Sequence, residues 1–335
     1  MTKKNNSNYG MNNTSALKII ILKTLRKLYI KAFSPIIGEK PKCETNPDSV
    51  SEIIYKELMH DKPSMVARFG STELSMLVNY IGIIKADKNI YKYINGEGTP
   101  WWWESKRMNQ MQNWSGFFPA TEDKITQFCE LMVQDIKEVD ILGSWLADEN
   151  YFLKQMSCIL VQREIQNPFF TKKPWTKALN GKKVLVIHPF AELIEHQYSN
   201  RRELLFKNKD ILPEFELHTI KAVQTLGGKH QVFKDWFEAL NNMKKQIDEA
   251  DYDICLIGAG AYGFPLAAHV KRNGKKAVHL GGSLQLLFGI KGKRWEDPNY
   301  NKDYNYAALM NEYWVRPGDK FLPENANSVE GACYW

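Results

Sequence analysis

The sequence has few cysteines and no long apolar run, and these two absences exclude several classes of protein. Cysteine occurs at Cys43, Cys129, Cys158, Cys255 and Cys333, an odd number with no C-x-x-C pair. Neither a disulfide framework nor a zinc site is therefore indicated. No apolar run approaches the ~20 residues needed to cross a bilayer, and the polar, Asn-rich N-terminus does not resemble a signal peptide. We expect a protein of the reducing cytoplasm.

The charge of the chain is moderately positive, at +7 over 335 residues. This charge fits phosphate-bearing ligands or an anionic membrane surface. Nucleic acid is not an expected partner, because zinc-finger spacings, aromatic RNP-like strands and a helix-turn-helix pattern are all missing from the sequence. The hydrophobic content of 44% excludes a disordered protein.

The N-terminal region predicts a polar disordered tail over residues 1–13, followed by an amphipathic helix over Ser15–Phe33. A stretch of five cations within that helix is not interrupted by any acid: Lys18, Lys23, Arg26, Lys27 and Lys31. Such a helix fits an anionic membrane surface, but it also fits packing on its own domain or on a partner subunit. Prolines then mark a linker, so we divide the chain into residues 1–45 and a catalytic domain of residues 46–335.

The remainder alternates between strand and helix patterns. Short apolar runs at Met65–Phe69, Lys183–Ile187, Asp253–Ile257 and Lys276–Leu280 predict strands, and helical patterns lie between them. A capping-box pattern, Ser49-x-x-Glu52, predicts the start of an earlier helix. Alternation of this kind predicts an α/β, Rossmann-like fold, with a mostly parallel sheet and helices on both faces. Ligands of such folds bind at the carboxyl ends of the strands.

The first predicted strand ends in Arg68-Phe-Gly-Ser-Thr-Glu73. Gly70 permits a sharp turn, Ser71 starts a helix and Glu73 falls in its first turn. Ser and Glu are also ordinary stabilising residues at a helix start. A guanidinium at the end of a buried strand needs a carboxylate or phosphate partner, so Arg68 is the stronger indication of function.

His188 directly follows the strand Lys183–Ile187. Its ring could donate to a phosphate or assist proton transfer, although a lone histidine is more often a hydrogen-bonded loop residue.

A literal G-x-G-x-x-G, Gly258-Ala-Gly-Ala-Tyr-Gly263, lies between a predicted strand and a predicted helix. Gly258, Gly260 and Gly263 would let the backbone approach a diphosphate at the helix N-terminus, with Tyr262 beside it. The motif lies late in the chain and the next strand lacks a ribose-binding acid, which argues against a nicotinamide or flavin enzyme. A structural glycine turn is the alternative.

A second glycine turn, Gly281-Gly282-Ser283, follows the next predicted strand, and Gln285 comes just after it. Lys291, Lys293 and Arg294 then supply cations suited to neutralising phosphate, or they belong to a solvated surface loop. Upstream, Trp101-Trp-Trp103 places three indoles in sequence. We expect some of them to line a groove for sugar rings or to pack in a core or interface.

Taken together, Ala67–Leu74 and the long segment Ile257–Trp295 resemble the GT-D-type glycosyltransferases of bacterial surface-glycan gene clusters, in a mostly uncharacterised subgroup. The resemblance covers roughly residues 50–300. It implies a Rossmann-like fold and transfer of a sugar from a nucleotide-sugar donor, typically UDP-linked, with the help of Mg²⁺ or Mn²⁺. The implied acceptor is a glycan or a lipid-linked glycan of capsule, lipopolysaccharide or glycoprotein biosynthesis.

This chain departs from the family at one position of the site. Members carry Asp-x-Glu after the Arg-Phe-Gly segment, whereas this sequence reads Ser71-Thr72-Glu73. A metal could still be held by Glu73, donor phosphates and waters. Alternatively, Arg68 and the Lys291–Arg294 group would neutralise the leaving diphosphate without a metal. Glu73 and His188 are the candidate general bases.

Two other functions fit the same features. A pyruvyl or phosphosugar transferase of the same pathways would use the same phosphate-binding elements with another donor. A non-catalytic glycan-binding or assembly protein is favoured by Ser71, which stands where the family has its acid.

Overall fold

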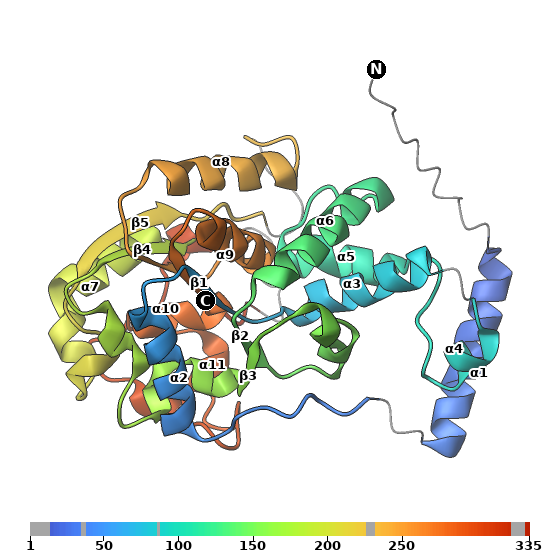
Figure 1. Cartoon of the computed structure of the whole chain (residues 1–335), viewed down its shortest axis with the longest axis horizontal. Helices are drawn as coiled ribbons and strands as arrows, with labels where there is room; N and C mark the ends of the chain where they lie inside the picture. The colour runs from blue at the N-terminus through green and yellow to red at the C-terminus, as the bar shows by residue number, and fades with distance from the viewer. Residues whose placement is uncertain (1–13, 35–37, 86–87, 226–231, 323–331) are drawn as a thin grey trace.

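The computed structural model describes residues 14–34, 38–85, 88–225, 232–322 and 332–335. Its centre is one seven-stranded sheet in the order β3-β2-β1-β7-β6-β4-β5 (Figure 1). All the neighbouring strands pair in parallel. The strands are β1 (Ser64–Ala67), β2 (Ile141–Ser144), β3 (Ile159–Gln162), β4 (Lys183–His188), β5 (Glu216–Lys221), β6 (Ile254–Ile257) and β7 (Lys276–His279).

Helices cover both faces of this sheet, because successive strand residues point to opposite sides and both sides are apolar. Met65 and Ala67 pack in one core with α3, α6, α8 and α9. Val66 packs in the other core with α2, α7 and α10. The α/β fold class predicted from the sequence is therefore confirmed. The helices are α1 (Ala16–Phe33), α2 (Pro47–Met59), α3 (Ser71–Ile84), α4 (Ile90–Ile94), α5 (Ser105–Ser115), α6 (Glu122–Asp135), α7 (Ala191–Leu205), α8 (Trp236–Glu249), α9 (Gly263–Arg272), α10 (Leu284–Leu287) and α11 (Lys293–Glu296).

A crevice lies between β4 and β6, where the direction in which successive strands are added to the sheet reverses. β4 connects outward to the edge strand β5, whereas its neighbour β6 connects inward to β7. Loops that leave adjacent strands in opposite directions open a ligand crevice at the carboxyl edge of the sheet. His188 ends β4 and Gly258 follows β6, so both lie at this edge.

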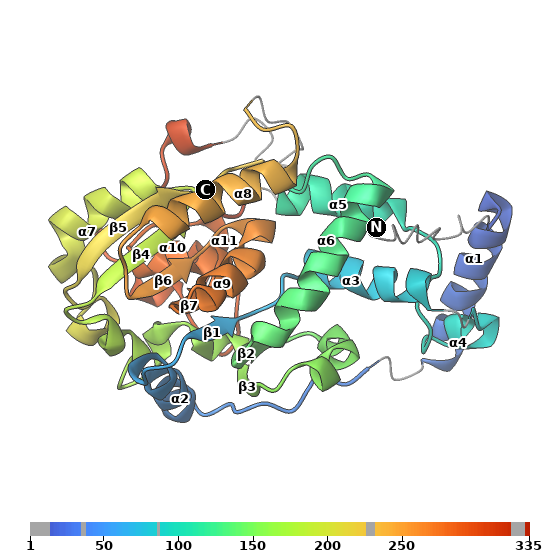
Figure 2. The ribbon, with the colours of Figure 1, turned by 45° about the horizontal axis from the view of Figure 1, so that its top comes forward.

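Helix α1 is present as predicted and packs on α4, at the end of the molecule opposite α7 (Figure 2). The contact is a small separate core in which Leu22 and Tyr93 enclose Trp101 and Trp102. Trp103 stacks on Tyr80 with ring centroids 6.5 Å apart. Of the two roles expected for these indoles, a groove lining or core packing, the structure shows packing for all three.

Two local predictions are also corrected. The helix predicted from Ser49 begins two residues earlier, at Pro47, because Asn46 is the N-cap and its Oδ1 accepts from Ser49 N at 3.0 Å. Strand β3 was not predicted, because its short run lies at the edge of the sheet and is only partly buried. The predicted disordered tail, residues 1–13, lies outside the described residues. No described helix is long and apolar enough to span a membrane.

Candidate functional site

A cavity of about 230 Å³ opens at the carboxyl edge of the sheet. It is lined by residues that follow four strands: Arg68 after β1, His188 at the end of β4, Gly258 after β6 and Gly281 after β7. Parallel strands bring these positions to one edge although they are far apart in sequence. The predicted residues that line the cavity are Arg68, Gly70, Ser71, Glu73, His188, Gly258, Gly260, Tyr262, Gly281, Gly282, Gln285 and Arg294.

The floor of the cavity is formed by two glycine turns that touch each other. A Cβ on Gly258 would lie 2.6 Å from Gly281 O and 2.8 Å from His188 Cδ2, so no side chain fits there. Gly260 and Gly281 have φ of +51° and +62°, in the left-handed region that favours glycine. Tyr262 forms a wall, with its ring stacked on Trp236 at a centroid distance of 4.9 Å. Bare backbone is therefore presented to a ligand, as an anion cradle requires.

Arg68 projects from the end of β1 across to the β7 turn. Its Nε donates to Leu280 O at 3.1 Å. Among the described residues, no carboxylate lies within ion-pair distance of its guanidinium. Burial lowers the pKa of Arg68, and the nearby charge of Arg163 lowers it further. The side chain stays charged at neutral pH, so a cation without a carboxylate partner faces the cavity.

Glu73 is buried in the first turn of α3, and its carboxylate folds back over Gly70. A Cβ on residue 70 would overlap Glu73 Oε2, which explains the glycine at this N-cap. Burial raises the pKa of Glu73, although its own backbone N–H, the Ser115 hydroxyl and the charge of Arg68 act in the opposite direction. This carboxyl is consequently more basic than an exposed one and suits proton transfer.

Two buried histidines line the cavity and are neutral at physiological pH. Burial lowers the pKa of both His188 and His279 to about 3. His188 Nδ1 accepts from Phe190 N at 3.0 Å, which leaves the ring proton on Nε2. The role that this arrangement favours for His188 is that of a hydrogen-bond donor through Nε2 and not that of a general base. Gly263 does not line the cavity; a Cβ there would overlap the ring of His279, so this glycine positions that ring.

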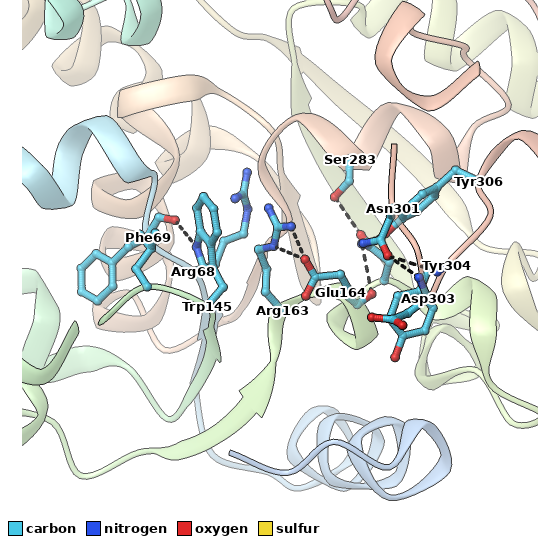
Figure 3. A network of polar contacts seen from close by, with 12 residues as sticks. Arg68, Phe69, Trp145, Arg163, Glu164, Ser283, Asn301, Asp303, Tyr304 and Tyr306 are labelled. Carbon is cyan, nitrogen blue, oxygen red and sulfur yellow. Dashed lines mark hydrogen bonds and ion pairs between the residues drawn. The ribbon is translucent and has the colours of Figure 1, made fainter. Parts of the chain in front are cut away.

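The sequence reasoning missed Arg163 and Trp145, which stand next to Arg68 (Figure 3). Trp145 Nε1 donates to Phe69 O at 3.0 Å, and the Arg163 guanidinium lies 4.3 Å from the Trp145 ring. Glu164 pairs with Arg163. A short apolar run, Ile159–Val161, precedes Arg163 much as Met65–Ala67 precedes Arg68, and this repeated pattern is the signal that could have revealed it.

The C-terminal residues also reach the cavity, through Tyr334 and Trp335. Gln285 Nε2 donates to Tyr334 O at 3.0 Å and to Lys291 O at 2.8 Å, so its amide nitrogen holds this segment in place. Arg294 lies 4.5 Å from the Tyr334 ring and donates to Cys333 Sγ.

Lys291 and Lys293 do not line the cavity, and Lys293 is exposed. The prediction that these two lysines contact phosphate is therefore wrong, and the backbone hydrogen bonds of their segment explain why. The backbone N–H groups of Lys291 and Lys293 bond to Val315 O and Trp335 O, so their segment runs along the outside of the site. Arg294 is the cation of this group that reaches the cavity.

The described residues at this site offer few ligands to a divalent metal ion. Among the described residues that line the cavity, Glu73 has the only acidic side chain, and its carboxylate is folded over Gly70. The described part of the chain brings together no group of three or more His, Cys, Asp or Glu side chains that could hold a metal. Mg²⁺ and Mn²⁺ require oxygen ligands, whereas the charged groups here are mostly arginines.

Comparisons with known proteins gave solved structures only. No family model and no curated protein matches the chain. The chain is similar to a selenomethionine-substituted structure of domain of unknown function 1792, with a TM-score of 0.41 and 12% identity over 89% of this chain and 100% of that one. A second structure of this domain, described as having a distinct glycosyltransferase fold, gives a TM-score of 0.40 and 12% identity over 88% of this chain and 99% of that one. A third structure, described as a new glycosyltransferase from Streptococcus sanguinis, gives a TM-score of 0.36 and 12% identity over 84% of this chain and 96% of that one.

These structures belong to the glycosyltransferase group that the sequence motifs resemble. At 12% identity and these TM-scores, the similarity is too remote to carry residues or an activity over to this chain.

Proposed function

We propose that this protein is a glycosyltransferase that moves a sugar from a nucleoside-diphosphate sugar to a hydroxyl of a glycan or lipid-linked acceptor. One observation carries the proposal: in the described lining, the cavity combines a floor of bare glycine backbone with three arginines and one buried acidic side chain. Backbone N–H groups and guanidinium groups are the donors that proteins use for phosphate. UDP-linked sugars are the first donors to test, because the sequence resemblance implies them.

The proposed reaction is a substitution at the anomeric carbon of the donor sugar. The acceptor oxygen forms the new bond to this carbon as the bond to the diphosphate breaks, and the nucleoside diphosphate leaves. Negative charge grows on the leaving diphosphate, and Arg68, Arg294 and the glycine turns would stabilise it. In an inverting reaction the acceptor proton would pass to Glu73. His188 Nε2 would donate a hydrogen bond to a substrate oxygen.

Aromatic side chains give the cavity surfaces suited to rings. Trp114, Trp145, Phe190, Tyr334 and Trp335 all line it, and Trp114 is 41% exposed. Indole and phenol faces pack well on the apolar faces of sugars and on bases. We assign these walls to the nucleoside and the sugars, and the arginines to the diphosphate between them.

The expected setting is the synthesis of a bacterial surface glycan on the cytoplasmic side of the membrane. All five cysteines are free thiols, which supports a reducing compartment.

A thermal-shift screen of nucleotide sugars, with and without Mn²⁺, tests the proposal. Ligands that bind the folded state raise its stability by mass action, by about 2.7 kcal/mol at a hundredfold excess over Kd. We expect at least one nucleoside-diphosphate sugar to raise the Tm, and the corresponding free sugar not to. Stabilisation by glycans alone would instead favour a non-catalytic glycan-binding protein, and stabilisation by another phosphorylated donor would favour a pyruvyl or phosphosugar transferase.

A further inference from the structure

We infer that Arg68, Arg163 and Arg294 together bind the donor diphosphate in place of a divalent metal. This inference rests on the proposed function and adds Arg163 and metal independence to it. All three side chains line the main cavity, and all three also line a smaller neighbouring cavity of about 40 Å³. They therefore stand at the boundary between the two spaces, and no lysine lines either cavity among the described residues.

The three guanidinium groups are held by different contacts. Arg68 is held by Leu280 O at 3.1 Å. Arg163 lies 4.3 Å from the Trp145 ring and pairs with Glu164, and Arg294 lies 4.5 Å from the Tyr334 ring and donates to Cys333 Sγ. A guanidinium is a planar fork of N–H donors. Planar forks of this kind bind phosphate oxygens in pairs.

The like charges of Arg68 and Arg163 are brought together without a carboxylate shared between them. Burial is the largest cause that lowers the pKa of Arg68, and the charge of Arg163 is the second. Among the described residues, Glu164 pairs with Arg163 and no carboxylate lies within ion-pair distance of Arg68. Glu164 therefore offsets the charge of Arg163 but not that of Arg68, and a buried cation is unfavourable unless an anion joins it. A bound diphosphate is the anion that fits.

Neutral groups complete the smaller cavity. Asn167 Oδ1 accepts from Ser283 Oγ at 2.7 Å, and Asn167 Nδ2 donates to Tyr306 Oη at 3.1 Å. These bonds fix the polar lining behind the arginines. In the described lining of this smaller space there is no acid to repel phosphate oxygens.

Calorimetry on the full chain with UDP and with inorganic pyrophosphate tests this inference. Each titration is run in excess EDTA and again in Mn²⁺. We expect both ligands to bind in EDTA with the same affinity, within about threefold, as in Mn²⁺. Arg163→Gln should weaken both by at least about tenfold, as expected for the loss of a charge-assisted hydrogen bond. Arg163→Lys keeps the charge but loses the planar fork, so its affinities should lie between those of the wild type and those of Arg163→Gln.

Arg316→Gln is the matched control, because Arg316 is exposed and pairs with Glu296 outside the cavity. It should leave both affinities unchanged. Thermal unfolding of each variant shows whether it is folded. UDP binding that requires Mn²⁺, or an unchanged affinity in folded Arg163→Gln, would overturn the inference and leave the proposed function standing. Pyrophosphate binding in EDTA without any nucleotide binding would support the arginine site and count against the nucleotide-sugar donor.

A separate observation concerns α1, which has apolar residues on two opposite faces. One face docks on the domain through buried Leu22 and through Arg26, whose Nη1 donates to Tyr93 O at 2.7 Å and to Gly98 O at 2.9 Å. The other face is exposed; Leu17 is 68% accessible and Leu28 is 59% accessible. Helical spacing places further exposed residues, Ile20, Ile21 and Leu25, on that same face.

The charges beside this exposed face fit one occupant. Lys18 lies on one flank of this stripe and Lys27 on the other, Lys31 lies within it near the end of the helix, all three are exposed, and the helix contains no acid. An apolar stripe flanked by lysines is the pattern of a helix that lies in an anionic lipid surface. We propose that α1 docks the protein on such a membrane. A second copy of the chain is a poorer occupant, because it would bring the same cations together.

Sedimentation with lipid vesicles tests this second proposal. The full chain should sediment with vesicles of phosphatidylglycerol and phosphatidylcholine, less so as salt rises, and not with phosphatidylcholine alone. Leu28→Asp should abolish sedimentation, whereas Leu204→Asp, an exposed leucine on α7, should not. A dimer in size-exclusion chromatography that Leu28→Asp dissociates, or equal sedimentation of wild type and Leu28→Asp, would overturn the proposal.

Discussion

The guanidinium of Arg68 lies against the α-carbon of Gly281, so that a Cβ at residue 281 would overlap Arg68 Nη2. The two residues follow β1 and β7, which are neighbours in the sheet although they lie far apart in sequence. The glycine turn and the arginine therefore form one unit, in which the absence of a side chain on one strand end makes room for the cation of the other.

This contact predicts that Gly281→Ala will weaken ligand binding as well as the fold. Gly281 has φ +62°, so alanine there costs about 1 kcal/mol in backbone strain alone. The added methyl also displaces Arg68. Gly274→Ala is the matched control, because Gly274 has φ +77° and nothing within 4 Å of the added Cβ. Denaturant unfolding should show a loss in both variants, and calorimetry with UDP should show weakened binding in Gly281→Ala alone. Equal UDP affinities in the two variants would disprove the coupling.

Glu73→Gln should separate a catalytic carboxylate from a helix-end charge. As a first-turn charge, Glu73 contributes about 0.3–1 kcal/mol to stability. As a general base it contributes roughly 10²–10⁴-fold to turnover. We therefore expect a small change in the free energy of unfolding and a large loss of sugar transfer, measured as product formed per enzyme. Near-normal turnover in a folded Glu73→Gln variant would remove Glu73 from the site.

Ser71→Asp introduces the acid that the glycosyltransferases resembled by this sequence carry at this position. Ser71 lies at the cavity, two residues before Glu73 in the same helical turn. Two carboxylates there would supply oxygen ligands that the present site lacks. Isothermal titration with Mn²⁺ should detect tighter binding in Ser71→Asp than in wild type. Identical Mn²⁺ isotherms would mean that the position of the acid, and not its absence, prevents metal binding.

The buried histidines predict loss of stability in acid. The folded pKa of His188 is about 3, below the ordinary value of about 6.5, so unfolding takes up a proton at any pH between the two. Stability therefore rises with pH across this window, and His188 alone accounts for a loss of about 2 kcal/mol at pH 5 relative to pH 7.

In His188→Asn, whose amide oxygen can replace Nδ1 as acceptor from Phe190 N, the pH 5 penalty should shrink by about that amount. Unfolding in urea at pH 7 and pH 5 measures it, with His196→Asn on the exposed face of α7 as the control. An undiminished penalty in His188→Asn would mean that the ring is not the titrating group.

Much of the site followed from local sequence patterns. Arg68, Gly258 and Gly281 each follow a short apolar run, and a parallel sheet brings such positions to one edge. Arg163 was not predicted as a site residue, because β3 is a short, partly buried edge strand with a weak sequence pattern. Tyr334 and Trp335 escaped because only tertiary contacts, such as that from Gln285 Nε2, bring the C-terminus to the cavity.

Lys291 and Lys293 show the opposite error, because the sequence predicted them in the site and the structure places them outside the cavity. Lys291 and Lys293 precede Arg294 in one basic run, and composition alone cannot tell which of them faces the cavity. Backbone bonds to Val315 and Trp335 decide it. The role of the Trp101–Trp103 run stayed open for a similar reason, since its partners, Leu22 of α1 and Tyr93 of α4, are remote in sequence.

The most direct test of the central claim is the release of nucleoside diphosphate from a panel of nucleotide sugars, compared between wild type and Glu73→Gln in EDTA. We predict that wild type releases the nucleoside diphosphate from at least one sugar donor, slowly with water and faster with an acceptor. Glu73→Gln should retain binding of that donor and lose the release. Glycan binding by the wild type, with no release from any nucleotide sugar in EDTA or in Mn²⁺, would contradict the account.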